Sequence, residues 1–232
     1  MDATTLPRRV RRRRLGLRQG IAVTLALCAA GIGAQPAWLQ AKAALAQVLL
    51  QSAWSESRDS GEAVKPWPWA DTHPVARLTV PRLSIDQIVL AGDAGRVLAF
   101  GPGWAEASAT PGSHGHSVIS GHRDNHFAFL RLLNDGDRVL VETTEGQRAY
   151  RVTAQQVVDS REQRIALDGG DTLTLVTCWP FDAITAGGPM RYVVTAIPEA
   201  TARGATATVA ASKPAQAGES SASATRRPSV SA

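Results

Sequence analysis

Cysteine is scarce in this chain of 232 residues, which contains only Cys28 and Cys178. Cys28 lies inside an apolar stretch, Cys178 ends a strand-like run, and nothing suggests that the two meet. A disulfide framework is therefore excluded as the basis of the fold. A lone cysteine in an exported domain is unusual, so Cys178 suggests chemistry rather than a crosslink.

Net positive charge is lacking beyond the first 20 residues. Those residues hold seven arginines and one aspartate, a net charge of +6, whereas the whole chain carries +5. The remaining 212 residues therefore sum to −1. A nucleic-acid-binding domain needs positive charge on its folded surface, so this distribution argues against a nucleic-acid partner.

Charge of either sign is missing between Arg18 and Lys42, a segment that includes the apolar run Gly20–Ala34. Arginines followed by an apolar span are typical of a single-pass signal anchor, which we expect at 20–41. The N-terminal segment 1–19 would then be cytoplasmic, and the rest would lie in the periplasm at the inner membrane. A cleaved signal peptide is the alternative, although no small-x-small cleavage site directly follows Ala34.

The segment 42–72 is expected to connect this anchor to the folded domain. A helix is predicted from about Pro36 to Trp54, lying on the membrane or on the domain, because apolar and small residues recur at helical spacing. These residues are Trp38, Ala41, Leu45, Val48, Leu49 and Ser52. The stretch Lys65–Asp71 (KPWPWAD) has two prolines that forbid a helix, and its tryptophans need covering, so we expect an extended arm packed on the domain.

Short alternating runs separated by turn residues dominate the segment 73–198, which predicts one all-β domain, an antiparallel barrel or sandwich. The runs are 75–85, 87–91, 117–121, 138–143, 149–158, 172–178 and 191–197. One short helix is predicted at 126–133. The final segment 199–232 is rich in Ala, Ser, Thr, Pro and Gly, and is predicted to be disordered.

Three side chains suited to acyl transfer occur at predicted strand ends. Cys178 ends one strand and Arg191 begins the next, so an antiparallel pairing would make them neighbours. His122 follows another strand. A thiolate can attack a carbonyl, an imidazolium can protonate the departing amine, and a guanidinium can hold the oxyanion. A metal site formed by His114, His116 and His122 is the alternative, but no carboxylate or second thiolate completes it at a usual spacing.

These motifs resemble the sortase family over about 39–197. Thr174–Cys178 (TLVTC) resembles the TLxTC signature, Arg191 stands in the place of the family's arginine, and Gly121-His122-Arg123 resembles its histidine segment. Four further stretches are similar to the proteobacterial branch called class GN: KPWPWAD, LAFGPG, GHRDNHF and CWPFD. Asn125 and Trp179 depart from the expected threonine and tyrosine, which would tune substrate contacts.

The resemblance implies a closed eight-stranded sortase β-barrel with short helices. It implies Cys178 as nucleophile, His122 as acid and base, and Arg191 as oxyanion or substrate arginine, with Thr177 and Trp179 contacting substrate. It also implies an exported partner with an LPxTG-like sorting signal and an amine acceptor in the cell envelope. No cofactor or metal is expected.

Two other functions stay open at this point. A thiol hydrolase would use the same three residues, with water in place of the amine. A membrane-tethered scaffold would merely pack Cys178, and its thiol would be inert to alkylation.

Overall fold

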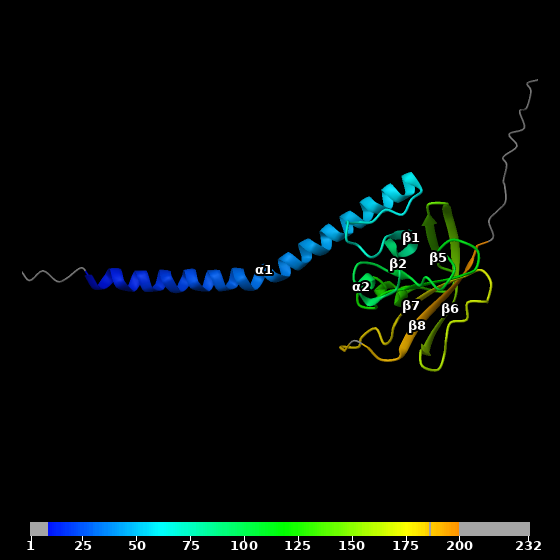
Figure 1. Ribbon diagram of the computed structural model, residues 1–232. Coiled ribbons are helices and arrows are strands. Elements are labelled where there is room, and N and C mark those ends of the chain that lie inside the picture. The colour runs from blue at the N-terminus through cyan, green and yellow to red at the C-terminus, as the bar shows by residue number, and fades with distance from the viewer. Residues whose placement is uncertain (1–8, 186, 200–232) are drawn as a thin grey trace, which may run out of the picture. The chain divides into compact units, whose positions relative to one another are not determined.

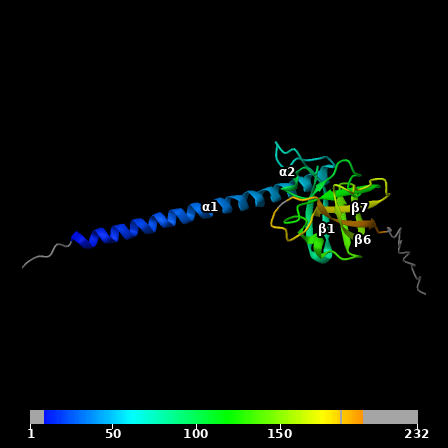
Figure 2. The same cartoon turned by 90° about the horizontal axis from the view of Figure 1, so that it is seen from below.

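The structure is a computed structural model that describes residues 9–185 and 187–199. Its strands form one closed barrel in the order β1-β2-β3-β4-β7-β8-β6-β5, seen from two directions in Figure 1 and Figure 2. The strands are β1 (Pro74–Val80), β2 (Ile85–Ala91), β3 (Gly103–Trp104), β4 (His116–Ser120), β5 (Arg138–Thr143), β6 (Gly146–Asp159), β7 (Thr172–Cys178) and β8 (Met190–Pro198). The predicted eight-stranded barrel is confirmed.

The strand predictions differ from the structure mainly at turns. The run 75–85 is divided because Pro81 lacks an amide hydrogen, and a 3-10 helix η1 (Pro81–Leu83) separates β1 from β2. The two-residue strand β3 was not predicted, because two residues carry no alternation. The helix expected at 126–133 is a shorter 3-10 helix, η2 (Ala128–Leu132), and one more short helix, α2 (Gly95–Leu98), precedes β3.

Alternation along the strands builds the core. In β1 every second side chain is buried, because successive side chains point to opposite faces of the sheet. The interior is filled by apolar side chains from most strands and from η2. Its largest fully buried members are Tyr150, Phe127, Leu78, Ile119, Leu130, Leu173 and Leu175.

Two of the pairings are parallel, namely β2 with β3 and β4 with β7. The β4–β7 pairing matters most for the site, because parallel neighbours bring the carboxyl ends of both strands to the same edge. The other six pairings around the barrel are antiparallel.

The predicted anchor and the helix after it form one continuous helix, α1 (Arg9–Ser60), that passes through Pro36 (Figure 1). A proline inside a helix removes one main-chain hydrogen bond and its ring crowds the carbonyl four residues earlier, which favours a kink, but the helix does not end there. Within α1, the part from Arg18 onward is long and apolar enough to cross a membrane by length and composition. The N-terminal residues 1–8 lie outside the described part of the chain.

The end of α1 packs on the barrel through a face that the sequence did not indicate. Leu50 and Trp54 are buried in a second apolar cluster with Ile88, Leu90 and Val97. From the predicted stripe, Trp38, Leu45 and Val48 are exposed. The stripe therefore does not face the barrel, since only the tertiary contact selects which helix face is covered.

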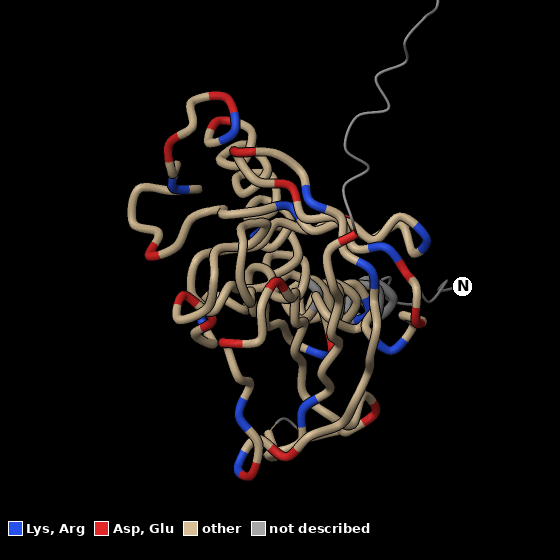
Figure 3. The backbone as a smooth tube through the Cα atoms, turned by 90° about the vertical axis from the view of Figure 1, so that its right-hand side faces the viewer, with Lys and Arg blue, Asp and Glu red and all other residues tan. Residues whose placement is uncertain are grey.

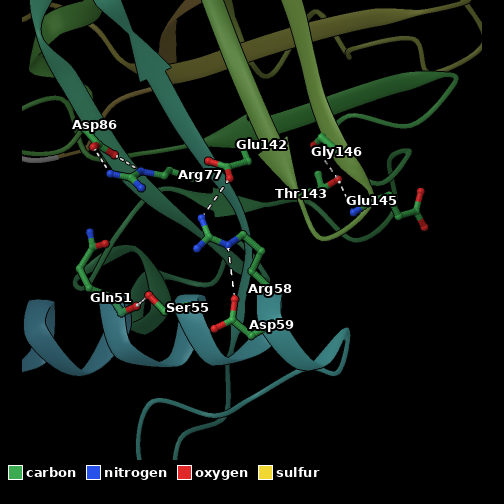
Figure 4. A network of polar contacts seen from close by, with 10 residues as sticks. All are labelled: Gln51, Ser55, Arg58, Asp59, Arg77, Asp86, Glu142, Thr143, Glu145 and Gly146. Carbon is green, nitrogen blue, oxygen red and sulfur yellow. Dashed lines mark hydrogen bonds and ion pairs between the residues drawn. The ribbon is translucent and has the colours of Figure 1, made fainter.

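Polar contacts also fasten the end of α1 (Figure 4). Arg58 donates a hydrogen bond to Glu142 of β5 at 3.4 Å. Outside this view, Gln47 donates one to the carbonyl of Phe100 at 2.8 Å. In the arm, Trp67 packs edge-on against Phe100, with ring centroids 5.2 Å apart. Trp69 is 82% exposed, so the expectation that the domain covers both tryptophans is wrong for this one.

Charges of both signs are interspersed along the barrel, as Figure 3 shows. The predicted tail 199–232 lies outside the described residues except for Glu199. That carboxylate accepts hydrogen bonds from Arg138 and Arg151, so the ordered chain extends at least one residue beyond the predicted end of the barrel.

Candidate active site

Cys178 is the last residue of β7, on the outer face of the barrel. Leu173 and Leu175 point inward into the core, so Thr174, Val176 and Cys178 share the opposite face. Cys178 is partly exposed, which leaves its thiol accessible at the edge where the strand ends.

Arg191 lies directly opposite Cys178 in the antiparallel pair of β7 and β8. The structure thus brings together the two residues that the sequence made neighbours across a loop. The Arg191 guanidinium donates hydrogen bonds through Nη1 to the carbonyls of Gly188, at 2.7 Å, and Met190, at 2.9 Å. In the described part of the chain, no carboxylate lies within ion-pair distance of it.

His122 follows β4 and is exposed. Ser120 pairs with Val176 in the parallel β4–β7 ladder, and the Gly121 amide donates to the Val176 carbonyl at 3.0 Å. His122 and Cys178 each lie two residues beyond this last pair, so both lie where neighbouring strands end, at the same edge of the barrel. The site therefore gathers at the carboxyl ends of β4 and β7 and at the start of β8.

The turn after His122 is closely packed. The Phe127 amide donates to the His122 carbonyl at 2.9 Å, and a Cβ atom at Gly121 would lie 2.6 Å from the Phe127 ring. Only glycine fits there. The half-buried His126 follows in the same turn, and burial lowers its pKa, with the charge of His122 as a smaller cause.

A cavity of about 220 Å³ lies on the same outer face, farther back along β7. Its floor includes Thr174 of β7 with Val193 and Thr195 of β8, and Ile165 of the loop between β6 and β7 covers it. An extended segment bound there would lead along the strands toward Cys178. A second, larger hollow of about 1240 Å³ lies beside α1 and reaches Asn125 and His126, but not Cys178.

A family model described as the sortase domain matches residues 78–199, which is more than half of the chain. The chain belongs to the sortase family. It is 28% identical to Sortase D of Bacillus subtilis (strain 168) over 119 residues, which are 50% of this chain and 60% of that protein. The matched segment thus spans less than two thirds of this relative.

A solved sortase structure with a TM-score above 0.5 shares the fold. A Clostridium perfringens Sortase D5 transpeptidase is 20% identical, with a TM-score of 0.54, and the match covers 68% of this chain and 99% of that one. Sortase C-1 from Actinomyces oris is 26% identical, with a TM-score of 0.47, over 55% of this chain and 75% of that one.

In this sortase domain the two predicted substrate contacts face away from the cavity. Thr177 is 2% exposed, and its hydroxyl donates to the Gly121 carbonyl at 2.7 Å. Trp179 stacks on Tyr192 and packs edge-on against Phe181. Alternation turns Thr177 inward, whereas Trp179 is half-buried in the loop after β7, and the substrate-binding role of both stays a prediction.

Two histidines of the alternative metal site form hydrogen bonds with other side chains. His114 Nδ1 lies 2.8 Å from Asp171 Oδ2, and His116 Nε2 lies 2.7 Å from the Thr174 hydroxyl. Among residues 9–185 and 187–199, no three His, Cys, Asp or Glu side chains gather in a way that could hold a metal ion.

Sequence reasoning missed Arg123, the residue after His122. Its side chain is 3% exposed and donates hydrogen bonds to three main-chain carbonyls of the loop between β7 and β8. The sequence shows only an arginine in a short polar turn. Its burial, which marks it as a structural contact, cannot be inferred from that pattern.

Proposed function

We propose that this chain is a membrane-anchored sortase of the class GN type that cleaves an LPxTG-like sorting signal and transfers the acyl group to an amine. One observation carries the proposal. Cys178 and Arg191 face each other across β7 and β8, and β4 brings the His122 segment to the same edge. A nucleophile, a proton carrier and a permanent cation thus meet at one accessible point.

In the acylation step the Cys178 thiolate attacks the scissile carbonyl and a C–S bond forms. Negative charge develops on the carbonyl oxygen, where the Arg191 guanidinium can stabilise it. The intermediate collapses as the C–N bond breaks, and protonated His122 supplies the proton that the departing amine needs. The product is a thioester on Cys178.

In the second step an amine attacks the thioester. His122 accepts its proton, the C–N bond forms, the C–S bond breaks, and the thiolate is regenerated. The acceptor is an amine of the cell envelope. A hydrolase would follow the same path with water, and it would give a free carboxylate instead of an amide.

The ionic state of the site limits its rate. A free thiol has a pKa of about 8.5 and a free imidazole a pKa of about 6.5, so few molecules hold thiolate and imidazolium together near neutral pH. The enzyme should therefore be slow, with a bell-shaped pH dependence of kcat/KM.

The outer-face cavity is the best candidate for holding the part of the signal upstream of the cleaved bond. It adjoins β7, which ends at Cys178, and β8, which begins beside Arg191, and Thr174, Val193 and Thr195 form its floor. Helix α1 would hold the enzyme at the inner membrane, with its N-terminus in the cytoplasm and the barrel in the periplasm. The apolar part from Arg18 onward supports this placement.

The test is thioester formation on Cys178, followed by intact mass after incubation with an LPxTG-type peptide. Wild-type protein should gain the mass of the acyl fragment, and Cys178→Ala should not. Cys28→Ala is the matched control and should react like wild type, because Cys28 lies in the apolar part of α1.

Three results would contradict the proposal. Loss of the thioester in well-expressed Cys28→Ala would show that the nucleophile is misassigned. A thiol inert to alkylation and to peptide would favour the scaffold. Acid as the sole product in the presence of an added amine would favour the hydrolase.

A further inference from the structure

Arg123 is a buried cation immediately after His122, and three of its four hydrogen bonds reach a loop far from it in the sequence. Nη1 donates to the Pro180 carbonyl at 2.7 Å, and Nη2 donates to the carbonyls of Ala183, at 2.8 Å, and Thr185, at 3.0 Å. Nε bonds to the exposed carboxylate of Asp124 at 3.1 Å. Four of the five donors of the guanidinium are therefore used.

The three carbonyls belong to the β7–β8 loop, residues 179–189. This loop begins beside Cys178 and ends beside Arg191, and the Trp179 amide closes its base by donating to the Met190 carbonyl at 3.1 Å. In the described residues 179–185 and 187–189, the loop's own main-chain contact is the bond from the Ala183 amide to the Pro180 carbonyl at 3.4 Å, and Ile184 is fully exposed. Arg123 holds its first half, and Arg191 bonds Gly188 in its second half.

We propose that Arg123 is a positioning residue that holds the β7–β8 loop beside the Cys178 thioester and thereby favours the amine over water as the second reactant. This inference rests on the proposed function. The cavity that would hold the acyl part lies back along β7, at Thr174, whereas the loop continues past Cys178. The loop therefore borders the side from which the leaving amine departs and the accepting amine arrives.

The amine and water compete for the same thioester carbonyl on Cys178. The C–S bond of the thioester breaks in both reactions. Attack by an amine forms a C–N bond and an amide, whereas attack by water forms a C–O bond and a carboxylic acid, and each returns a proton to the Cys178 and His122 pair. Water is small and abundant, so an amine can win only if an ordered wall orients it and restricts water.

Two substitutions separate geometry from charge. Arg123→Gln removes the cation and most of the donors. Arg123→Lys keeps the charge, but a single ammonium nitrogen cannot reproduce the planar fork that reaches three separate carbonyls. Arg148→Gln is the matched control, because Arg148 is also largely buried and donates to a carbonyl, that of Ser113, near the opposite end of β7.

The experiment measures the ratio of amide to acid formed from an LPxTG-type peptide with a glycine peptide as the amine. Both Arg123 variants should lower this ratio about tenfold, and Arg148→Gln should leave it unchanged. Hydrogen exchange at the amides of residues 181–185 should accelerate in both Arg123 variants. A ratio does not depend on how much enzyme is folded, so a loss of stability alone would not change it.

The outcomes separate this inference from the proposed function. An unchanged ratio in both Arg123 variants would overturn the inference, and so would unchanged loop exchange. A wild-type ratio in Arg123→Lys alone would assign the effect to charge and would also overturn it. If wild-type protein formed no thioester at all, the proposed function would fall.

Discussion

The two ends of β7 use arginine in opposite ways. At its beginning, Asp171 accepts a hydrogen bond from the Gly115 amide at 2.6 Å, one from Arg148 at 2.6 Å, and lies 2.8 Å from the His114 ring. At its end, Arg191 and Arg123 bond mainly to main-chain carbonyls. Six residue steps, about 20 Å of strand, separate the two ends.

The difference lies in what happens to the positive charge. The bond from the Gly115 amide, followed by the bonds from Arg148 and His114, lowers the pKa of Asp171, so the carboxylate and the arginine neutralise each other. Carbonyls hold an arginine without neutralising it, and the one carboxylate near Arg123 is exposed. The first end pairs its arginine with a carboxylate, whereas the second leaves Arg191 bonded to carbonyls, as its proposed role at the oxyanion requires.

The largest expected effect comes from making the same substitution at both ends. Arg191→Lys should lower the rate of thioester formation by about 100-fold or more, because a preorganised donor to the oxyanion is lost although the charge remains. Arg148→Lys should keep the wild-type rate and lower the free energy of unfolding by about 1 kcal/mol. Intact mass and thermal unfolding measure the two quantities.

If Arg191→Lys and Arg148→Lys both formed the thioester at the wild-type rate, the proposed difference between the two ends of β7 would be wrong. An equal decrease in the rate of thioester formation in both variants, with both well folded, would also contradict this difference, because Arg148 would then contribute to the reaction.

An intermediate effect is expected from Thr177→Val, which removes the buried hydrogen bond that ties β7 to the carbonyl before His122. An unsatisfied buried carbonyl should cost about 1 to 3 kcal/mol of unfolding free energy. Displacement of His122 should slow thioester formation about tenfold. Thr177→Ser keeps the hydroxyl and should restore the rate; failure of serine to do so would favour a direct substrate contact through the lost methyl group.

The smallest effect concerns pH and Asp171. Its pKa is lowered in the folded state, so its bonds stabilise the fold above the unfolded pKa of about 4, and this contribution is lost as the pH falls below that value. The Tm of Asp171→Asn should therefore lie below that of wild type near neutral pH, and the gap should narrow toward about pH 2.

Asp168→Asn, on the exposed loop before β7, is the control and should show no such gap. A gap for Asp171→Asn that stays constant from neutral to acid pH would mean that packing, and not ionisation, stabilises this end. High salt should reduce the gap, since the carboxylate is partly exposed.

Local patterns in the sequence were sufficient for the strands and for part of the site. Alternation marked β5 and β7 at their observed bounds, because a half-buried strand imposes a period of two. Consecutive antiparallel strands joined by a loop meet at one edge, so the sequence alone predicted that Cys178 and Arg191 are neighbours, and the structure pairs them. The motifs around them then indicated the family.

Contacts between distant segments decided the rest. The parallel pairing of β4 with β7 puts the segments that lead to His122 and Cys178 side by side, and no local pattern encodes which strands become parallel neighbours. The inward turn of Thr177, the covered face of α1 and the bonds from Arg123 to the β7–β8 loop depend on the same long-range packing. The sequence by itself determined which groups could do the chemistry, because residue type sets acidity and donors. Only the tertiary structure decided which of them are buried and whose carbonyls they hold, because burial and hydrogen-bond partners come from segments far apart in the chain.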